Sequence, residues 1–299
     1  MQRCGFVAVL GAPNAGKSTL INGWVGSKVS IVSSKVQTTR SLVRGIAMRG
    51  ESQVIFIDTP GIFRPTKRLE KAMVAAAWQG EAEAEIIVLV VDASRKKVDR
   101  DTNDILERLI AQKDGRSCVL LLNKVDKANK ENLLIFAQKL NQRYPFAATF
   151  MVSALRNDGA DDVLAWLADH VEEGEWHFPE DEVSDMPMRL LAAEITREKL
   201  FRKLHEELPY ALAVETENWE EFDNGDVKIS QVIYVARDSH KAIVLGKGGA
   251  QIGEIGELSR LELEEILGTK VHLKLFVKVQ ENWAEDPEKY RIWGLDYSA

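Results

Sequence analysis

Short apolar runs alternate with helix-like segments over about the first 170 residues. The apolar runs, rich in Val, Ile and Leu, are 6–10, 53–57, 86–91, 118–122 and 149–152. Apolar spacings of three and four, typical of amphipathic helices, recur in the segments 69–82, 102–112, 131–143 and 161–171. This alternation predicts an α/β domain whose mostly parallel sheet is covered by helices on both faces. In such folds, ligands bind beyond the carboxyl ends of the strands.

The pattern changes after residue 172. Residues 173–187 are acidic, include Pro179 and Pro187, and lose the apolar period, which predicts a linker. The segments that follow predict in turn a helix, two strands, a Gly-rich turn, a helix and a strand, over 188 to about 207, 211–222, 227–237, 246–249, 250–267 and 271–279. The sequence therefore predicts a first domain over 1–172 and a smaller α+β domain with a C-terminal tail over 188–299.

Composition limits the alternatives without identifying an activity. The chain has 299 residues, of which 45% are hydrophobic and 28% charged, values typical of a globular protein. No apolar run is long enough for a membrane span or resembles a cleaved signal peptide. Cys4 and Cys118 lie in apolar runs and are expected to be reduced core residues, as in a cytosolic protein. The net charge of −7 means that any nucleic-acid binding must use a local basic patch.

Residues 11–18 match the phosphate-binding pattern G-x-x-x-x-G-K-[ST]. Its amide groups, at the start of a predicted helix, favour anions, and Lys17 is expected to reach the β- and γ-phosphates. Ser18 would supply a hydroxyl to Mg²⁺. The expected nucleotide contacts in this segment are Gly11, Ala12, Pro13, Asn14, Ala15, Gly16, Lys17, Ser18 and Thr19.

Two further segments complete the expected phosphate and metal site. Asp58-Thr59-Pro60-Gly61 directly follows a predicted strand, where Asp58 would hold Mg²⁺ through water and the Gly61 amide would contact the γ-phosphate. Gln37-Thr38-Thr39-Arg40 lies in a polar stretch, where Thr39, favoured over Thr38, would complete the Mg²⁺ shell and move when the γ-phosphate leaves. A Thr-rich loop without this role remains the alternative.

The base is expected to be guanine. In Asn123-Lys124-Val125-Asp126, Asn123 and Asp126 would select guanine, with Asp126 accepting from its N–H groups and Lys124 packing over the base. Adenine lacks those donors and would leave a buried acceptor unpaired. Ser153-Ala154-Leu155 follows the next strand, where the Ala154 amide would bond the guanine O6. With the phosphate loop, these residues predict a GTP site, which a phosphate loop alone would not.

The catalytic groups are less fully specified. Ile62 follows Gly61 at the position where Ras-like proteins carry a water-orienting glutamine, so the candidates for hydrolysis are Lys17, Thr39, Gly61 and Asn14. In related GTPases an asparagine at the position of Asn14 helps to hold K⁺ near the phosphates, and such a cation would stabilise developing charge. On the other interpretation, Asn14 only caps the loop.

The second domain carries a candidate RNA site. Residues 244–252 resemble the G-x-x-G segment of a KH domain, with Gly246, Lys247, Gly248 and Gly249 between the predicted strands and helix. Lys241 and Ile252 would border the groove. Residues 188–299 hold 15 Lys and Arg against 21 Asp and Glu, which favours local contacts over broad electrostatic binding. The C-terminal aromatic residues would either stack on bases or anchor the tail to its own domain: Trp283, Tyr290, Trp293 and Tyr297.

Over nearly its full length the chain resembles the Era family, which joins a Ras-like P-loop GTPase domain to a type II KH domain. The resemblance rests on the five nucleotide segments above, on Gly246–Gly249, and on Glu281-Asn282-Trp283 after the last strand. It implies hydrolysis of GTP to GDP, use of Mg²⁺, binding to the 3′ end of 16S ribosomal RNA, and a role in 30S subunit assembly. It also implies a cytoplasmic protein with some contact at the inner membrane. A monomer is expected.

Three alternatives remain. The chain could be chiefly an RNA-binding module with nucleotide as a structural ligand, which equal RNA affinity in the GTP and GDP forms would favour. It could be a membrane-associated signalling GTPase, which liposome co-sedimentation would address. An RNA-modification GTPase would need a further catalytic group, and no candidate cysteine stands out.

Overall fold

A computed structural model describes residues 1–33, 35, 38–112, 114–205 and 208–299. The chain forms two compact units, each described by itself below. The first contains Met1–Val32, Thr39–Asp185 and Tyr290–Ala299, and the second contains Ser33–Thr38 and Met186–Lys289. The sequence placed the tail with the second domain, whereas the structure groups its last ten residues with the first unit.

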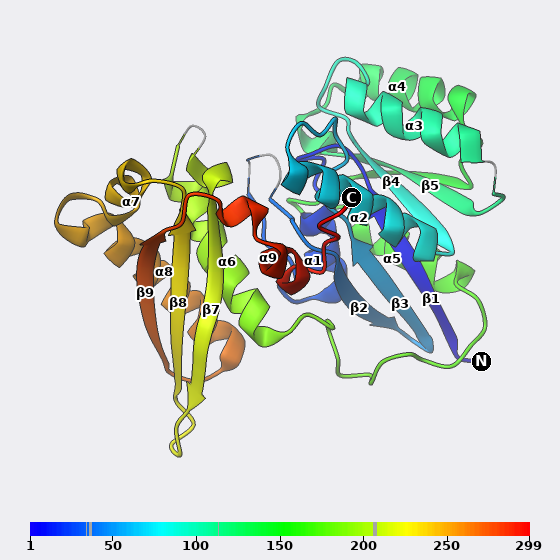
Figure 1. The fold of residues 1–299 in the computed structure, drawn as a ribbon. Coiled ribbons are helices and arrows are strands. Elements are labelled where there is room, and N and C mark those ends of the chain that lie inside the picture. The colour runs from blue at the N-terminus through cyan, green and yellow to red at the C-terminus, as the bar shows by residue number, and fades with distance from the viewer. Residues whose placement is uncertain (34, 36–37, 113, 206–207) are drawn as a thin grey trace. The chain divides into compact units, whose positions relative to one another are not determined.

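The first unit is built on one sheet with the strand order β2-β3-β1-β4-β5-β6 (Figure 1). Its strands are β1 (Arg3–Leu10), β2 (Val43–Arg49), β3 (Ser52–Asp58), β4 (Ile86–Asp92), β5 (Ser117–Asn123) and β6 (Ala148–Val152). All neighbouring pairs are parallel except β2 and β3. The five expected strands and the mostly parallel sheet are thereby confirmed.

Helices cover both faces of this sheet. They are α1 (Lys17–Val25), α2 (Arg68–Glu83), α3 (Arg100–Gln112), α4 (Lys130–Arg143) and α5 (Ala160–His170). Apolar residues of α2, α3 and α4 share one buried cluster with side chains of β1, β4 and β5. On the other face, the Trp24 ring of α1 stacks on Phe56 at 4.6 Å and its indole N–H donates to Ala160 O at the start of α5. Since β3, β1, β4 and β5 run parallel, the segments that follow them meet at one edge of the sheet.

Strand β2 was not expected. It pairs antiparallel with β3 through a tight turn in which Gly50 has φ +59°. The acidic segment expected to be a linker lies along this side of the sheet: Ile46 N donates to Val183 O, and the Gln53 side chain donates to Phe178 O. The first bond satisfies a backbone group of β2 that an edge strand otherwise leaves open, and the second satisfies a backbone group of the acidic segment.

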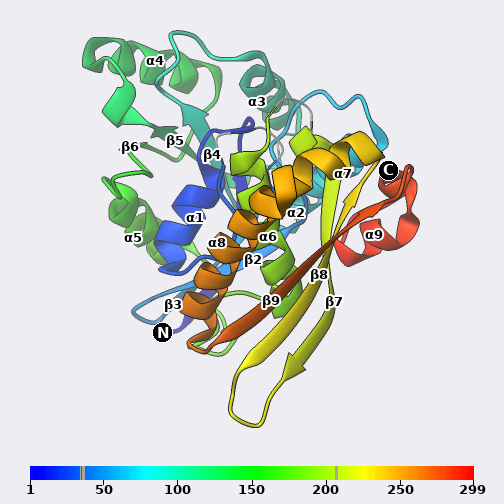
Figure 2. The ribbon, with the colours of Figure 1, turned by 90° about the vertical axis from the view of Figure 1, so that its left-hand side faces the viewer.

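The second unit is a three-stranded sheet covered by helices on one face (Figure 2). Its elements are α6 (Met188–Lys203), β7 (Leu212–Glu221), β8 (Val227–Val235), α7 (Asp238–Leu245), α8 (Ala250–Leu267) and β9 (Val271–Val279). The hairpin of β7 and β8 is antiparallel, and β9 runs parallel to β8. Both α8 and β9 have the expected bounds. The final helix, α9 (Pro287–Ile292), leads into the tail.

This unit contains one helix that was not predicted and one helix end that was predicted wrongly. Helix α7 was not expected, and α6 ends at Lys203 rather than near residue 207, because Leu204 already has extended dihedral angles. Residues 206 and 207 lie outside the described residues. Within the described part of the chain, no helix combines the length and apolar character needed to cross a membrane.

Candidate nucleotide and nucleic-acid sites

The phosphate loop joins the end of β1 to the start of α1, as its sequence predicts. Gly16 has φ +103°, and a Cβ on it would lie 2.2 Å from Asn123 Nδ2, so only glycine fits. Ser18 and Thr19 lie in the first turn of α1. The Lys17 side chain is buried and its Nζ donates to Gly11 O at 3.1 Å and Ala12 O at 3.3 Å. Burial lowers the pKa of Lys17 to about 8, although the nearby Asp58 carboxylate opposes the shift.

A cluster of oxygen atoms lies beside this loop. Ser18 Oγ donates to Asp58 Oδ2 at 2.8 Å and lies 3.1 Å from Thr39 Oγ1. Ser30 Oγ also donates to Asp58 Oδ2. Asp58 is fully buried, which raises the pKa of its carboxyl group against the effects of Ser30, Lys17 and Ser18. The structure thus brings Ser18, Thr39 and Asp58 together, while Gln37 lies outside the described residues.

This cluster fits Mg²⁺. Asp58 Oδ1 is buried and has no hydrogen-bond partner among the described residues, which is costly for a carboxylate unless a cation or water satisfies it. The neighbouring hydroxyl groups of Ser18 and Thr39 are hard oxygen ligands of the kind that Mg²⁺ prefers. The donor set therefore agrees with the metal assignment made from the sequence.

Asn123 braces the site internally. Its Nδ2 donates to Ala15 O at 2.8 Å, and its Oδ1 accepts from Lys124 N at 2.8 Å and Ala154 N at 3.0 Å. The side chain is 1% exposed. The Ala154 amide, assigned from the sequence to the guanine O6, is thus bonded to Asn123 here. The structure links three loops through Asn123, and the Asp126 carboxylate remains the candidate for base selection.

Asp126 is oriented by a neighbouring loop. Ser153 Oγ donates to Asp126 Oδ1 at 2.7 Å, and this bond lowers the pKa of the Asp126 carboxyl group. Asp126 is consequently ionised at neutral pH and can accept from two N–H groups of guanine. Leu155, by contrast, is 77% exposed.

Lys124 connects the base segment to the phosphate loop. Its Nζ donates to Asn14 O at 2.6 Å and to Asp92 Oδ2 at 2.7 Å. Burial opposes ionisation of Asp92, but hydrogen bonds from Lys124 and Ser94 bring its pKa below the usual value. Both Lys124 (φ +66°) and Asn14 (φ +62°) adopt left-handed conformations that are uncommon outside glycine.

The segment after β3 also contacts the phosphate loop. Thr59 Oγ1 donates to Val9 O at 2.8 Å, and Ile62 N donates to Gly11 O at 3.2 Å. A Cβ on Gly61 would lie about 3.0 Å from Pro13 atoms, so the backbone approaches closely there. Ile62 is buried in the core cluster of α2 and β4, and it cannot orient water.

The G-x-x-G segment joins α7 to α8 in the second unit. Gly246, Gly248 and Gly249 have φ of +72°, +61° and +81°, a backbone path suited to glycine. A Cβ on Gly246 would lie 2.7 Å from the Gln251 Cβ. Lys247 is exposed at the tip of the loop. The loop leads into the N-terminus of the 18-residue helix α8, which favours anions. This geometry suits a loop that clamps the phosphate backbone of a nucleic acid.

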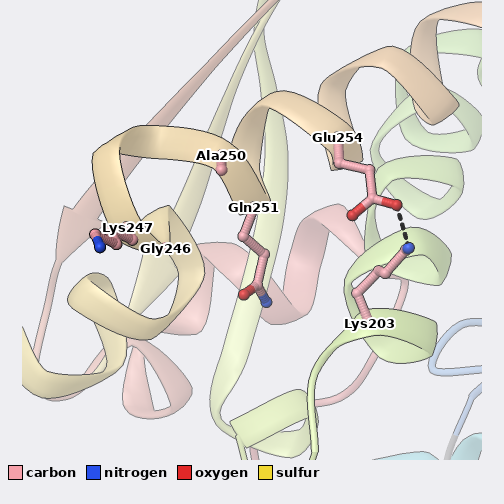
Figure 3. A pocket seen from close by; sticks show the side chains of 6 residues that line it. All are labelled: Lys203, Gly246, Lys247, Ala250, Gln251 and Glu254. Atoms are coloured by element: carbon pink, nitrogen blue, oxygen red, sulfur yellow. Dashed lines mark hydrogen bonds and ion pairs between the residues drawn. The ribbon is translucent and has the colours of Figure 1, made fainter.

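A shallow cavity of about 310 Å³ lies beside the loop (Figure 3). It is lined by Lys203, Gly246, Lys247, Ala250, Gln251 and Glu254. Lys203 of α6 forms an ion pair with Glu254 across it. Lys241 lies on α7, whereas Ile252 packs against the hydrophobic core, so Ile252 serves helix packing.

The aromatic residues of the C-terminus are largely buried. Trp283 is 3% exposed and donates to Ala211 O at 3.3 Å. Tyr290 and Trp293 are 0% and 3% exposed. These residues anchor the chain rather than present rings to bases, but Tyr290 and Trp293 belong to the first unit instead of the second.

Sequence reasoning missed two residues of the nucleotide site. Ser30 lies in a loop without any motif, and nothing in the sequence relates it to Asp58. Asp92, in contrast, is the last residue of β4, as Asp58 is the last residue of β3. This strand-end position could have identified Asp92 from the sequence as a site residue.

Two family models match the chain. The model described as "50S ribosome-binding GTPase" matches residues 6–124, and the "KH domain" model matches residues 207–284.

Similarity to curated and solved proteins extends over the whole chain. It is 56% identical to GTPase Era of Sinorhizobium medicae over 99% of this chain and 94% of that protein, and 56% identical to GTPase Era of Brucella suis with the same coverage. A crystal structure of an Aquifex aeolicus Era variant bound to GDP·AlF₄⁻ shares 38% identity with a TM-score of 0.92, over 98% of this chain and 99% of that one. An Era complex with MgGDPNP and nucleotides 1506–1542 of 16S ribosomal RNA gives the same values. The chain belongs to the Era family of GTPases.

Proposed function

We propose that this protein hydrolyses GTP to GDP and phosphate, binds the 3′ end of 16S ribosomal RNA, and acts in assembly of the 30S subunit. The observation that carries the proposal is the presence, in one chain, of a guanine-selective phosphate site and a G-x-x-G clamp. Family membership and the 16S RNA bound by a solved relative support it.

The described side chains divide the work of hydrolysis. Lys17 binds the β- and γ-phosphate oxygens, whose charge raises the proton affinity of its buried amine. Ser18, Thr39 and Asp58 would hold Mg²⁺, which would neutralise charge on the transferring phosphoryl group. The Gly61 amide binds the γ-phosphate, and Asp126 selects the base. Because Ile62 cannot orient water, turnover without a further factor is slow.

We extend the proposal to K⁺ at Asn14. Its left-handed backbone and the bond that its carbonyl group accepts from Lys124 hold the residue in place within the phosphate loop. We expect GTP hydrolysis to be about tenfold faster in KCl than in NaCl, since a correctly placed cation stabilises transition-state charge. Replacing Asn14 with alanine should remove most of this difference while GDP affinity is kept. Equal rates of the unaltered protein in the two salts would refute the K⁺ assignment.

We also propose that the protein is a cytoplasmic monomer with at most peripheral contact with the inner membrane. The family resemblance is the support for this statement. Sedimentation of the purified chain, alone and with liposomes, addresses both parts.

Lys247 provides the test of RNA binding. Replacing Lys247 with alanine should weaken binding to a single-stranded 16S 3′-end RNA roughly three- to tenfold and reduce the salt slope by about 0.7, because one phosphate contact is lost. Fluorescence anisotropy at several salt concentrations measures both quantities with the GTP- and GDP-bound protein.

The matched control is Lys139→Ala, which removes the same charge from an exposed position on α4. It should leave RNA affinity within twofold. If the Lys247 and Lys139 variants bind alike, the loop is not the RNA clamp. If the unaltered protein binds RNA equally in both nucleotide states, nucleotide is a structural ligand and not a switch.

A further inference from the structure

The last ten residues of the chain belong to the nucleotide-binding unit. The division between units falls between Lys289 and Tyr290. Lys289 pairs with Glu215 and lies 3.5 Å from the Tyr234 ring, all within the second unit. Tyr290, Trp293 and Leu295 are at most 6% exposed. The tail is therefore packed within the first unit.

Two aromatic rings of the tail hold two arginines of the first unit. The Arg40 guanidinium lies over the Trp293 ring at 5.7 Å, and Arg40 is 3% exposed. The Arg68 guanidinium lies over the Tyr297 ring at 4.5 Å and also donates to Tyr297 O at 3.3 Å. The rings of Tyr290 and Tyr297 meet edge to face at 5.0 Å, which fixes the second ring. Both distances lie within the range of cation–π interactions. Because Arg40 is buried, its interaction with Trp293 is expected to be the stronger of the two.

Both arginines lie next to segments of the nucleotide site. Arg40 directly follows Thr39, whose hydroxyl group lies 3.1 Å from Ser18 Oγ in the cluster of oxygen atoms around Asp58. Arg68 is the first residue of α2, the helix that follows the Asp58–Gly61 segment. The tail thus contacts Arg40, the residue next to Thr39, and Arg68, the first residue of α2. Figure 1 shows the C-terminus beside α2.

We propose that Trp293 and Tyr297 are positioning residues for the GTP-bound state, an inference that rests on the proposed GTPase function. By holding Arg40, Trp293 limits the freedom of Thr39 before the metal and γ-phosphate bind. Tyr297 does the same for the start of α2 through Arg68. Ordering these segments is an entropic cost of forming the GTP state, and a prearranged segment lowers it. The GDP state lacks the γ-phosphate and does not require this order.

The test compares GTP-form and GDP-form properties of the full chain. Trp293→Leu should lower both the hydrolysis rate and the affinity for a non-hydrolysable GTP analogue about tenfold, and leave GDP affinity within twofold. Trp293→Phe, which keeps a ring, should recover most of the loss. Ile292→Ala changes an exposed residue of α9 and is the matched control. Arg40→Gln combined with Trp293→Leu should be no worse than either change alone, as expected of a contacting pair.

Each outcome decides a separate point. Equal loss of GDP and GTP-analogue affinity, or additive effects of the two changes, would show that Trp293 only supports the fold and would overturn the inference. A Trp293→Leu protein that matches the unaltered one would do the same while leaving the proposed function intact. If Trp293→Leu does not fold, the exposed residue Arg68 provides a second test through Arg68→Gln. Selective loss of GTP-analogue affinity in this variant supports the inference, and no loss overturns it. Absence of GTP hydrolysis by the unaltered protein would refute the proposed function itself.

Discussion

Replacing Lys17 with alanine is expected to slow GTP hydrolysis at least about 10²-fold. The Lys17 amine is buried beside the oxygen cluster of Ser18 and Asp58, so the charge that it presents to phosphate is poorly screened. Removal of one preorganised donor from such a site typically costs about 10²–10³ in rate. Phosphate release under single-turnover conditions, at saturating GTP and Mg²⁺, measures the effect.

Lys139→Ala again serves as the control, because it removes a positive charge from the exposed surface of the same unit. It should hydrolyse GTP at the unaltered rate. A Lys17→Ala protein that folds, binds GTP and turns it over normally would show that residues 11–18 are not the phosphate site.

Asp126→Asn is expected to reverse base selection. In the proposed GTP complex the carboxylate accepts from two N–H groups of guanine, and hydrogen bonds to a charged group contribute about 1.5–3 kcal/mol each. Their loss should weaken GTP binding about 10²–10⁴-fold. Asparagine presents an amide donor that matches the C2 carbonyl of xanthine, so XTP should bind better than GTP. Competition against a fluorescent guanine nucleotide measures both affinities.

Asp161→Asn, at an exposed position in the first turn of α5, is the isosteric control and should bind GTP normally. Ser153→Ala should show a smaller loss, since Ser153 only orients Asp126. An Asp126→Asn protein that still prefers GTP over XTP would move base recognition to other residues.

Local sequence was sufficient where one segment carries the whole signal. The phosphate loop, Asp58–Gly61 and the G-x-x-G turn are contiguous, and their glycines and strand-end positions are visible in the chain itself. Helix α8 and strand β9 were predicted with their observed bounds for the same reason: each has a sustained apolar period and begins or ends at glycine or a turn.

The misses arise from tertiary structure. Strand β2 contains Arg44, Gly45 and Arg49, which break the apolar alternation, and it is stabilised by pairing with β3. Helix α7 has only eight residues, too few to establish a helical period. The Ser30–Asp58 bond, the bracing role of Asn123 and the grip of Trp293 on Arg40 all join residues far apart in the chain. No local pattern encodes them.

The acidic stretch along β2 has a consequence for how this protein behaves in concentrated solution. Its backbone bond to Ile46 of β2, together with its negative charges, covers a sheet edge that would otherwise offer a pairing template to other chains. We therefore expect that shortening this stretch would expose the edge of β2 and favour self-association of the protein.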